Sequence, residues 1–436
     1  MKNKTKLRQS FDYMVLGGIA TTATNTFASG ALMTAYALIL GAGNFFIGVL
    51  NGVQSFGNIM HLGAAWLIEK GYSPKKISLW VSFISKPFFF LTACTAFFAD
   101  TKIALPLMLV SYMIAYLIGS LAGGSFLPWM KALVPAQLVG RFLGVRLKYI
   151  TLTKVICFSL TSYILGLVKR LYPTYEIYAY SAFLVMATLV GLLAAASFFY
   201  MDDREIQLET DKKFLHKIKM ALSDKKFRKL ILSLSSLSFS NNLMMPFLTV
   251  FLLKYFLLPM WQVLIFTLIN QLVDSFILKS WGRISDKRGV EYVLIRAAQI
   301  SIACAGAFAV LSWIYPTNTY VLYGTLAVIY IILGVATSGL NLGTNGSAML
   351  YSPKKMAAVY LSTNSSCKFL AATLGAVFAG VLLTICEQFE HAIAAYFFPF
   401  HSSQGGFSFF CFCCIMFIVS IQIVRHMKKT VGKVPV

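Results

Sequence analysis

Four ionisable side chains fall within long apolar runs of this sequence. The acid is Asp274, and the cations are Lys86, Lys154 and Lys368. Charges inside apolar segments are costly and indicate a function by default. An acid whose pKa follows the distance of a lysine could carry a proton, and lysines in such a setting could bind an anion. A static ion pair that only stabilises the protein is the alternative.

Polar residues accompany these charges at helical spacing. Asn270 and Gln271 precede Asp274 on one helical face, and Asn364 shares a face with Lys368. A second polar stripe lies between residues 51 and 61 at helical spacing, and its members are Asn51, Gln54, Asn58 and His61. Such stripes should face a cavity or another helix rather than lipid.

The elements that carry these residues are predicted from composition. Hydrophobic residues make up 58 % of the 436 residues, charged residues 12 %, and the mean hydropathy is +0.74. A membrane-spanning helix needs about 20 mostly apolar residues. Twelve such segments are predicted: 11–38, 44–68, 77–98, 104–130, 143–168, 177–200, 229–253, 260–280, 292–314, 319–347, 356–385 and 405–425. Their length argues against β-barrel strands, so we expect an all-α polytopic membrane protein.

The net charge of +23 is distributed unevenly between the predicted loops. Most cations fall in segments that an inside N-terminus makes cytoplasmic, and the exceptions in outer loops are Lys102, Lys169, Arg170 and Lys254. This asymmetry predicts cytoplasmic N- and C-termini. The expected location is a bacterial inner membrane. The same cations suit contact with anionic lipids at the cytoplasmic face, and nucleic-acid binding is not needed to explain them.

The longest predicted inner segment divides the spans into two sets of six. We expect an N-terminal half at 1–200, a linker at 201–228 and a C-terminal half at 229–436. The linker is either an amphipathic helix on the inner leaflet or a solvated connection. The halves repeat at an offset of about 217 residues, which relates Asn25 to Asn242 and Gln54 to Gln271. The fold is therefore expected to consist of two six-helix pseudo-repeats.

A glycine- and charge-rich segment follows the eighth predicted span. It reads Gly282-Arg283-Ile284-Ser285-Asp286-Lys287-Arg288-Gly289 and resembles the loop signature of the major facilitator superfamily. In the first half the copy is degenerate, because Ala65 replaces the glycine and Glu69 the aspartate. The segment from Pro128 to Arg146 is also similar to the loop between helices 4 and 5 of many members.

The resemblance implies roles for particular residues. Asp286 would meet the start of helix 5 near Gly140 and Arg141 and latch the cytoplasmic gate; the alternative is a charged loop that only fixes topology. In the family, helices 2, 5, 8 and 11 form the moving contact between the halves, and Lys154, Lys368 and Asp274 lie on these helices. Lys86 lies on a helix that is peripheral in the family and is interpreted as structural or as snorkelling to the membrane surface. Candidate contacts in the central cavity are Asn25, Tyr112, Tyr116, Asn241, Asn242, Tyr330 and Asn341.

The function implied by the resemblance is secondary active transport of a small polar solute by alternating access. An organic anion is one substrate class, and protons are one coupling ion. A nontransporting sensor or a channel on the same scaffold is the alternative. We expect a monomer and no cofactor. No metal site is expected, because nearly all cysteines lie in apolar spans without histidine partners. An enzyme is not expected, because the histidines are scattered.

Overall fold

The computed structural model describes residues 2–28, 30–99, 102–133, 139–203, 214–314, 319–352 and 357–397. Within these ranges the secondary structure is helical and no strand occurs. Nine helical stretches of the described chain are long and apolar enough to cross a membrane. The predicted all-α membrane class is confirmed.

The chain separates into two compact units. The first comprises Met1–Ala42 and Val53–Lys217, and the second comprises Gly43–Gly52 and Ile218–Val436. The short segment Gly43–Gly52 belongs to the second unit because its backbone lies close to a helix there: a Cβ atom on Gly48 would stand 2.6 Å from the carbonyl oxygen of Ala376.

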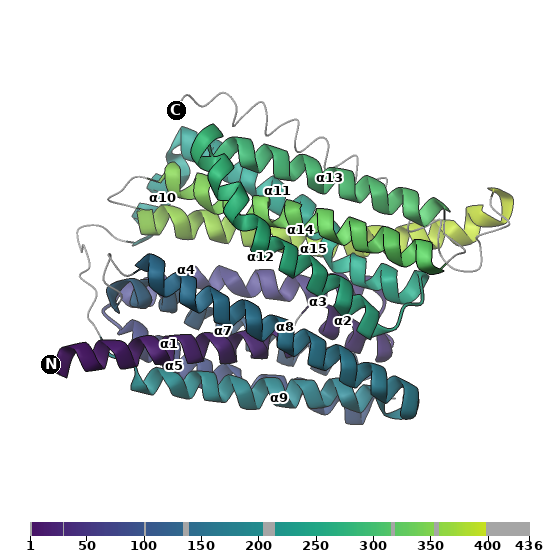
Figure 1. The fold of residues 1–436 in the computed structure, drawn as a ribbon, viewed down its shortest axis with the longest axis horizontal. Coiled ribbons are helices and arrows are strands. Elements are labelled where there is room, and N and C mark those ends of the chain that lie inside the picture. Colours follow the sequence, from purple (N-terminus) through teal and green to yellow (C-terminus); the bar gives the residue numbers. More distant parts are fainter. Residues whose placement is uncertain are drawn as a thin grey trace. The chain divides into compact units, whose positions relative to one another are not determined.

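The first unit is built from helices that lie side by side. They are α1 (Lys2–Phe27), α2 (Ala31–Ile39), the last part of α3 (Asn44–Gly57), α4 (His61–Glu69), α5 (Pro74–Ser85), α6 (Pro87–Ala93), α7 (Ala104–Leu133), α8 (Val139–Leu171) and α9 (Glu176–Ser197). Helix α1 packs against α8 and α9, and α5 packs against α7 (Figure 1). Trp129 and Met14 are fully buried in an apolar cluster at one end of this unit.

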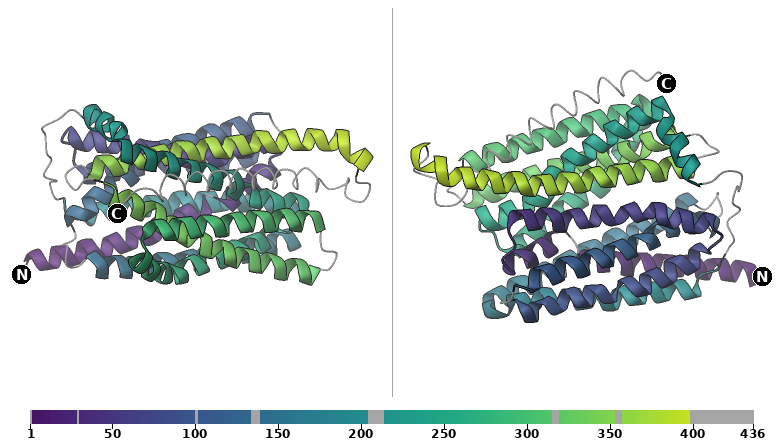
Figure 2. Two further views of the ribbon diagram at one scale, coloured as in Figure 1. Left: turned by 90° about the horizontal axis from the view of Figure 1, so that it is seen from above. Right: turned by 180° about the vertical axis from the view of Figure 1, so that it is seen from behind.

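The second unit contains longer uninterrupted helices. They are α11 (Lys225–Val250), α12 (Met260–Arg288), α13 (Val290–Ile314), α14 (Thr319–Leu350) and α15 (Ala357–Phe397), preceded by the short α10 (Phe214–Ser223), which begins in the first unit. Helix α11 runs along α15, and α14 lies beside both α12 and α13 (Figure 1, Figure 2).

Local sequence signals explain several helix ends. The carboxylate of Asp224 accepts hydrogen bonds from the backbone N–H groups of Lys226 (2.9 Å) and Phe227 (3.2 Å) and so caps α11. Ser73 caps α5, and Pro74 occupies its first turn. Gly289, with φ of +86°, ends α12, a conformation that glycine adopts without strain.

Most predicted spans match the observed helices, and three are interrupted. The span 44–68 divides into α3, a short 3₁₀ turn at Asn58–Met60 and α4. The first span, 11–38, consists of two helices, because α1 ends at Phe27 and Gly30, just before α2, has a positive φ of 62°. The segment 77–98 is likewise interrupted at Pro87, which begins α6. The last predicted span, 405–425, lies outside the described residues.

Candidate functional site

A polar cavity lies within the first unit. It encloses 310 Å³, which is the size of small-molecule sites. Its polar lining is Thr21, Asn25, Asn58, His61, Ser82, Lys86, Tyr116, Ser120 and Arg146. Its apolar lining is aromatic or small, with Phe89, Phe126, Phe198, Ala115, Ala122, Ala194, Ala195, Gly17, Gly18, Gly119, Gly123 and Gly191. Because aromatic rings and hydrogen-bonding groups share these walls, the cavity can hold a solute with both polar and apolar parts.

Lys86 reaches this cavity from the junction of α5 and α6, just before Pro87. Its aliphatic arm lies across Gly191 of α9, where a Cβ atom would stand 2.8 Å from Lys86 Cδ. The missing side chain at Gly191 therefore leaves the room that the lysine occupies. Lys86 Nζ is 5.5 Å from the ring centroid of Phe89, within the range of a cation–π contact.

Arg146 enters the same cavity from the second turn of α8. It passes Gly18 of α1, where a Cβ atom would stand 3.1 Å from Arg146 Nε. Its guanidinium carbon is 5.0 Å from the ring centroid of Phe126. Nε is buried and has no hydrogen-bond acceptor among the described residues. The cavity therefore holds a second cation whose hydrogen-bonding capacity is not fully used.

Two of the residues predicted for a central cavity, Asn25 and Tyr116, line this cavity together. The predicted Tyr112 is fully buried behind Tyr116, with ring centroids 4.8 Å apart, and its hydroxyl accepts a hydrogen bond of 2.7 Å from Gln54 Nε2. Lys154 is partly buried further along α8 and does not line the cavity.

Lys86 and Arg146 are not among the site residues that the sequence predicts. Arg146 lies at the start of the predicted span 143–168, close to the cationic inner loop, and the sequence favours a structural or snorkelling role for Lys86. The signal for both is a glycine opposite the cation, Gly18 or Gly191, on a helix distant in the sequence. That pairing becomes visible only when the helices are packed.

Helix α12 carries the predicted acid Asp274 and its polar neighbours. The backbone carbonyl of Asp274 accepts a hydrogen bond of 2.9 Å from Ser338 Oγ on α14, and its side chain is partly buried. Asn270 Nδ2 donates to the carbonyl of Tyr330 at 3.5 Å. Gln271 Oε1 is buried without a partner among the described residues. Asn270 and the backbone of Asp274 thus contact α14.

The other predicted residues of the second unit are dispersed. Asn364 on α15 is buried, with an Oδ1 that lacks a partner in the described chain, and Lys368 one turn later is partly buried. Asn242 Nδ2 donates to the carbonyl of Ser238, Asn341 is exposed, and Asn241 lines a pocket of only 20 Å³.

The signature, predicted to be a loop, is helical in the structure. Helix α12 continues through Gly282, Arg283, Asp286 and Lys287 to Arg288, and only Gly289 turns before α13 begins. Asp286 therefore lies in the last turn of α12, where the dipole of its own helix disfavours an acid. It is exposed, and its predicted latch partner Arg141 has a side chain outside the described residues.

The basic residues of the signature form a surface pocket with aromatic residues. Its lining includes Lys287, Arg288, Arg296, Trp281 and Tyr292. Arg288 Nη1 donates to the Tyr292 hydroxyl at 2.8 Å. The degenerate first-half copy differs, because Glu69 forms an ion pair with Lys217 of α10, with Nζ and Oε1 3.1 Å apart.

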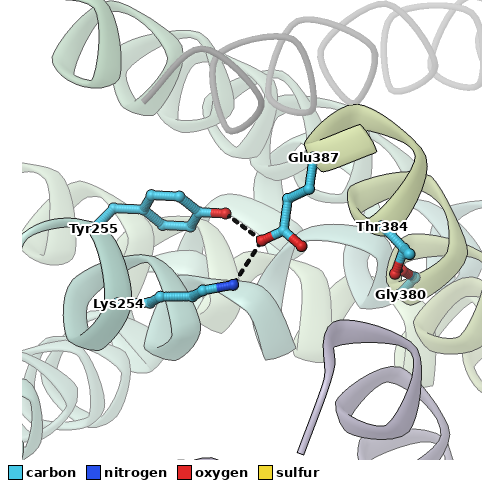
Figure 3. Close-up of polar contacts among 5 residues, drawn as sticks. All are labelled: Lys254, Tyr255, Gly380, Thr384 and Glu387. Atoms are coloured by element: carbon cyan, nitrogen blue, oxygen red, sulfur yellow. Dashed lines mark hydrogen bonds and ion pairs between the residues drawn. The ribbon is translucent and has the colours of Figure 1, made fainter. Parts of the chain in front are cut away.

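A second ion pair stands near the end of α15. Lys254 Nζ and the Tyr255 hydroxyl both point to one oxygen of the Glu387 carboxylate, at 2.6 Å and 2.9 Å (Figure 3). Lys254 and Tyr255 belong to the π-helical turn that follows α11. The carboxylate thus ties this turn to α15. No group of three or more potential metal ligands occurs in the described part of the chain.

Comparisons with known proteins identify the family. The model of the Major Facilitator Superfamily matches residues 9–376. Among solved structures, a variant of the nucleoside transporter NupG has a TM-score of 0.74 at 13 % identity, covering 96 % of this chain and 99 % of that one. A bacterial homologue of the iron transporter ferroportin has a TM-score of 0.71 at 13 % identity, covering 98 % and 99 %.

A D-xylose–proton symporter has a TM-score of 0.70 at 13 % identity, with 99 % and 100 % of the chains covered. A comparison with curated sequences gives no significant match. At these identities the structures show the fold, while the family model covers most of the sequence. The chain therefore belongs to the major facilitator superfamily, as its helices and its glycine-rich signature predicted.

Proposed function

We propose that this chain is a secondary active transporter that moves a small polar solute across a membrane by alternating access. The observation that carries the proposal is the 310 Å³ cavity, in which Asn25, Tyr116 and Arg146 face the interior of a helical bundle. Polar groups inside a membrane protein are expensive unless they serve a bound solute or one another. The family supplies the transporter scaffold.

Purified protein in liposomes tests the proposal. Uptake should saturate with solute concentration and show counterflow, because a carrier exposes one site alternately to the two sides. Flux that rises without saturation would instead indicate a channel. Ligand binding without any flux would indicate a sensor on the same scaffold.

Asp274 is the proposed coupling acid. It is the partly buried acid of a polar stripe on α12, and a carboxylate in such surroundings can bind and release a proton as its neighbours move. The Asp274→Asn variant should lose uptake driven by a proton gradient and keep counterflow. Loss of both would assign Asp274 to solute binding or folding. Lys154 and Lys368 are the proposed cations that modulate it.

The charge asymmetry supports an orientation with both termini in the cytoplasm. We propose that the protein is a monomer in a bacterial inner membrane. Under this orientation the pocket around Lys287, Arg288 and Arg296 lies at the cytoplasmic face and would hold anionic lipid headgroups. Asp286 in the same turn remains the proposed gate latch. Asp286→Asn should shift cysteine accessibility toward the inward-open state; an unchanged ratio would reject the latch.

A further inference from the structure

The cavity of the first unit contains two cations and no acid. Its lining in the described chain includes Lys86 and Arg146, and neither Asp nor Glu contributes. No ion pair of Lys86 or Arg146 forms with a described residue. Each cation is instead placed against an aromatic ring, Phe89 or Phe126. Rings offset part of the cost of a buried charge, whereas a hydrogen-bonded anion would offset more of it.

The helices around the cavity are shaped to admit both cations. Gly191 and Gly18 stand where any larger residue would meet Lys86 or Arg146, so the two long side chains can lie against neighbouring helices. A lysine that only needed to reach the membrane surface would not require a glycine on α9 beneath its arm. The glycines therefore belong to the arrangement that aims the cations inward.

Arg146 gives the strongest indication that the cavity binds a ligand. Its Nε is buried and has no acceptor in the described chain, although a guanidinium presents five N–H donors. The planar fork of arginine matches the two oxygens of a carboxylate or phosphate, and the lysine ammonium adds a point charge. A buried donor that finds no protein acceptor is satisfied when such an anion binds.

From this geometry we infer that the first unit contains an anion-binding site in which Lys86 and Arg146 neutralise the carboxylate or phosphate group of a small organic anion. The neutral polar side chains Asn25, Asn58, Ser82 and Ser120 provide further hydrogen bonds. The rings of Phe126 and Phe198 lie 5.9 Å apart on the lining and suit an apolar body. The anion-binding site is inferred from the structure alone, and only the step that makes this anion the transported solute rests on the proposed function.

Binding to purified protein tests the site without requiring transport. Thermal shifts in detergent would be recorded with phenyl phosphate and benzoate as organic anions, with inorganic phosphate as the headgroup alone, and with benzyl alcohol as the neutral body. We expect the organic anions to stabilise the protein, because a ligand stabilises the state that binds it. Inorganic phosphate should bind more weakly, and benzyl alcohol should produce no shift at matched concentration.

Two variants separate the cations from the rest of the unit. Lys86→Gln and Arg146→Gln should each weaken binding by about tenfold or more, as for loss of a charge-assisted hydrogen bond. The control is Lys148→Gln, which removes an exposed cation two residues beyond Arg146 and should bind normally. If Lys86→Gln proves unfolded, Lys86→Met keeps the aliphatic arm over Gly191 and removes only the charge.

The outcomes distinguish this inference from the proposed function. Wild-type affinity in both cation variants, or equal binding of benzyl alcohol and benzoate, overturns the anion site. Saturable uptake of a neutral solute, without anion binding, would support the proposed transport and reject the anion-binding site. Anion binding that depends on both cations, in a protein that shows no flux, supports the site and rejects transport.

Discussion

The two units build the same aromatic contact with the same residue types. In the first unit Tyr112 lies 6.3 Å from Phe89, and in the second Tyr330 lies 6.2 Å from Phe308, measured between ring centroids. These residues correspond at an offset of 218 to 219 positions. In each unit the tyrosine is buried, so the scaffold is repeated down to the packing of individual rings.

The space beside this contact differs between the units. Three residues of the first cavity, Ser82, Lys86 and Ala122, are replaced at the same offset by Ser301, Ala305 and Leu340. These three line the pocket of the second unit, which encloses 20 Å³ against 310 Å³ in the first. The same place in the repeat is thus open and cationic in one unit, and nearly closed and neutral in the other.

The units also differ in which helix contributes the small residue. In the first unit Gly57 of α3 approaches Tyr116 of α7, and a Cβ atom there would stand 2.9 Å from the Tyr116 carbonyl oxygen. The corresponding residues in the second unit are Asp274 and Gly334, so the glycine lies on the opposite helix. In the first unit Tyr116 therefore faces a cavity, and in the second unit Asp274 lies where α12 contacts α14.

Placing the lysine of the first unit in the second gives the largest expected effect. Ala305→Lys puts a charge into a closed pocket whose described lining offers no acid. An uncompensated buried charge costs about 3 to 5 kcal/mol, so the melting temperature in detergent should fall sharply. The control is Ala305→Met, which adds a similar length without the charge. Equal stability of the two variants would mean that water or an anion enters this pocket. The pocket of the second unit would then not be closed, and the proposed difference between the two units would be wrong.

The close contact of Gly334 with α12 predicts the next largest loss of stability. A Cβ atom on Gly334 would stand 2.7 Å from the carbonyl oxygen of Asn270, so Gly334→Ala must move α12 away from α14. Overpacking of this kind costs about 1 to 3 kcal/mol. Gly282→Ala, also on a helix but with nothing within 4 Å, should be neutral or slightly stabilising. Thermal unfolding of both variants measures the difference, and equal losses would contradict the packing argument.

Sequence alone predicts the elements of this fold well. The apolar runs have the length that a bilayer demands, so the long helices follow from composition and spacing. The signature from Gly282 to Gly289 was placed at the correct position but with the wrong conformation. Helix α12 continues through Gly282 because glycine is permitted in a helix, and only Gly289 adopts the positive φ that ends it.

The candidate site is less predictable from sequence because its determinants are contacts between distant segments. Asn25 and Tyr116 were found through the family resemblance. Lys86 and Arg146 were not selected, since an arginine near a predicted helix end has the same sequence signature whether it faces lipid headgroups or a cavity. What distinguishes the two cases is a glycine on another helix, Gly18 or Gly191, and no local pattern reveals that contact.

The ion pairs of the two units predict a smaller difference. Glu387 accepts hydrogen bonds from Lys254 and Tyr255, whereas Glu69 has one ion-pair partner, Lys217, among the described residues. Because Lys254 is 47 % exposed, solvent screens its contribution, and Glu387→Gln should cost only about 1 kcal/mol. Glu69→Gln should cost a similar amount, about 1 kcal/mol, because the side chains of Lys217 and Glu69 are less exposed, at 15 % and 26 %, and solvent screens this pair less. Melting temperatures at low and high salt would show the loss shrinking as salt rises; a loss independent of salt would argue against an electrostatic cause.

The smallest expected effect concerns two serines at the same place in the repeat. Ser338 Oγ donates to the Asp274 carbonyl at 2.9 Å, while Ser120 Oγ reaches Asn58 Oδ1 only at 3.4 Å. Ser338→Ala should cost about 1 kcal/mol and Ser120→Ala less, because the longer bond is weaker. Ser120 also lines the cavity, so its removal should alter solute binding more than stability, whereas Ser338→Ala should alter stability more than binding. Parallel melting and binding measurements on both variants would test whether the repeat uses one hydrogen-bonding position for a solute in the first unit and for helix packing in the second.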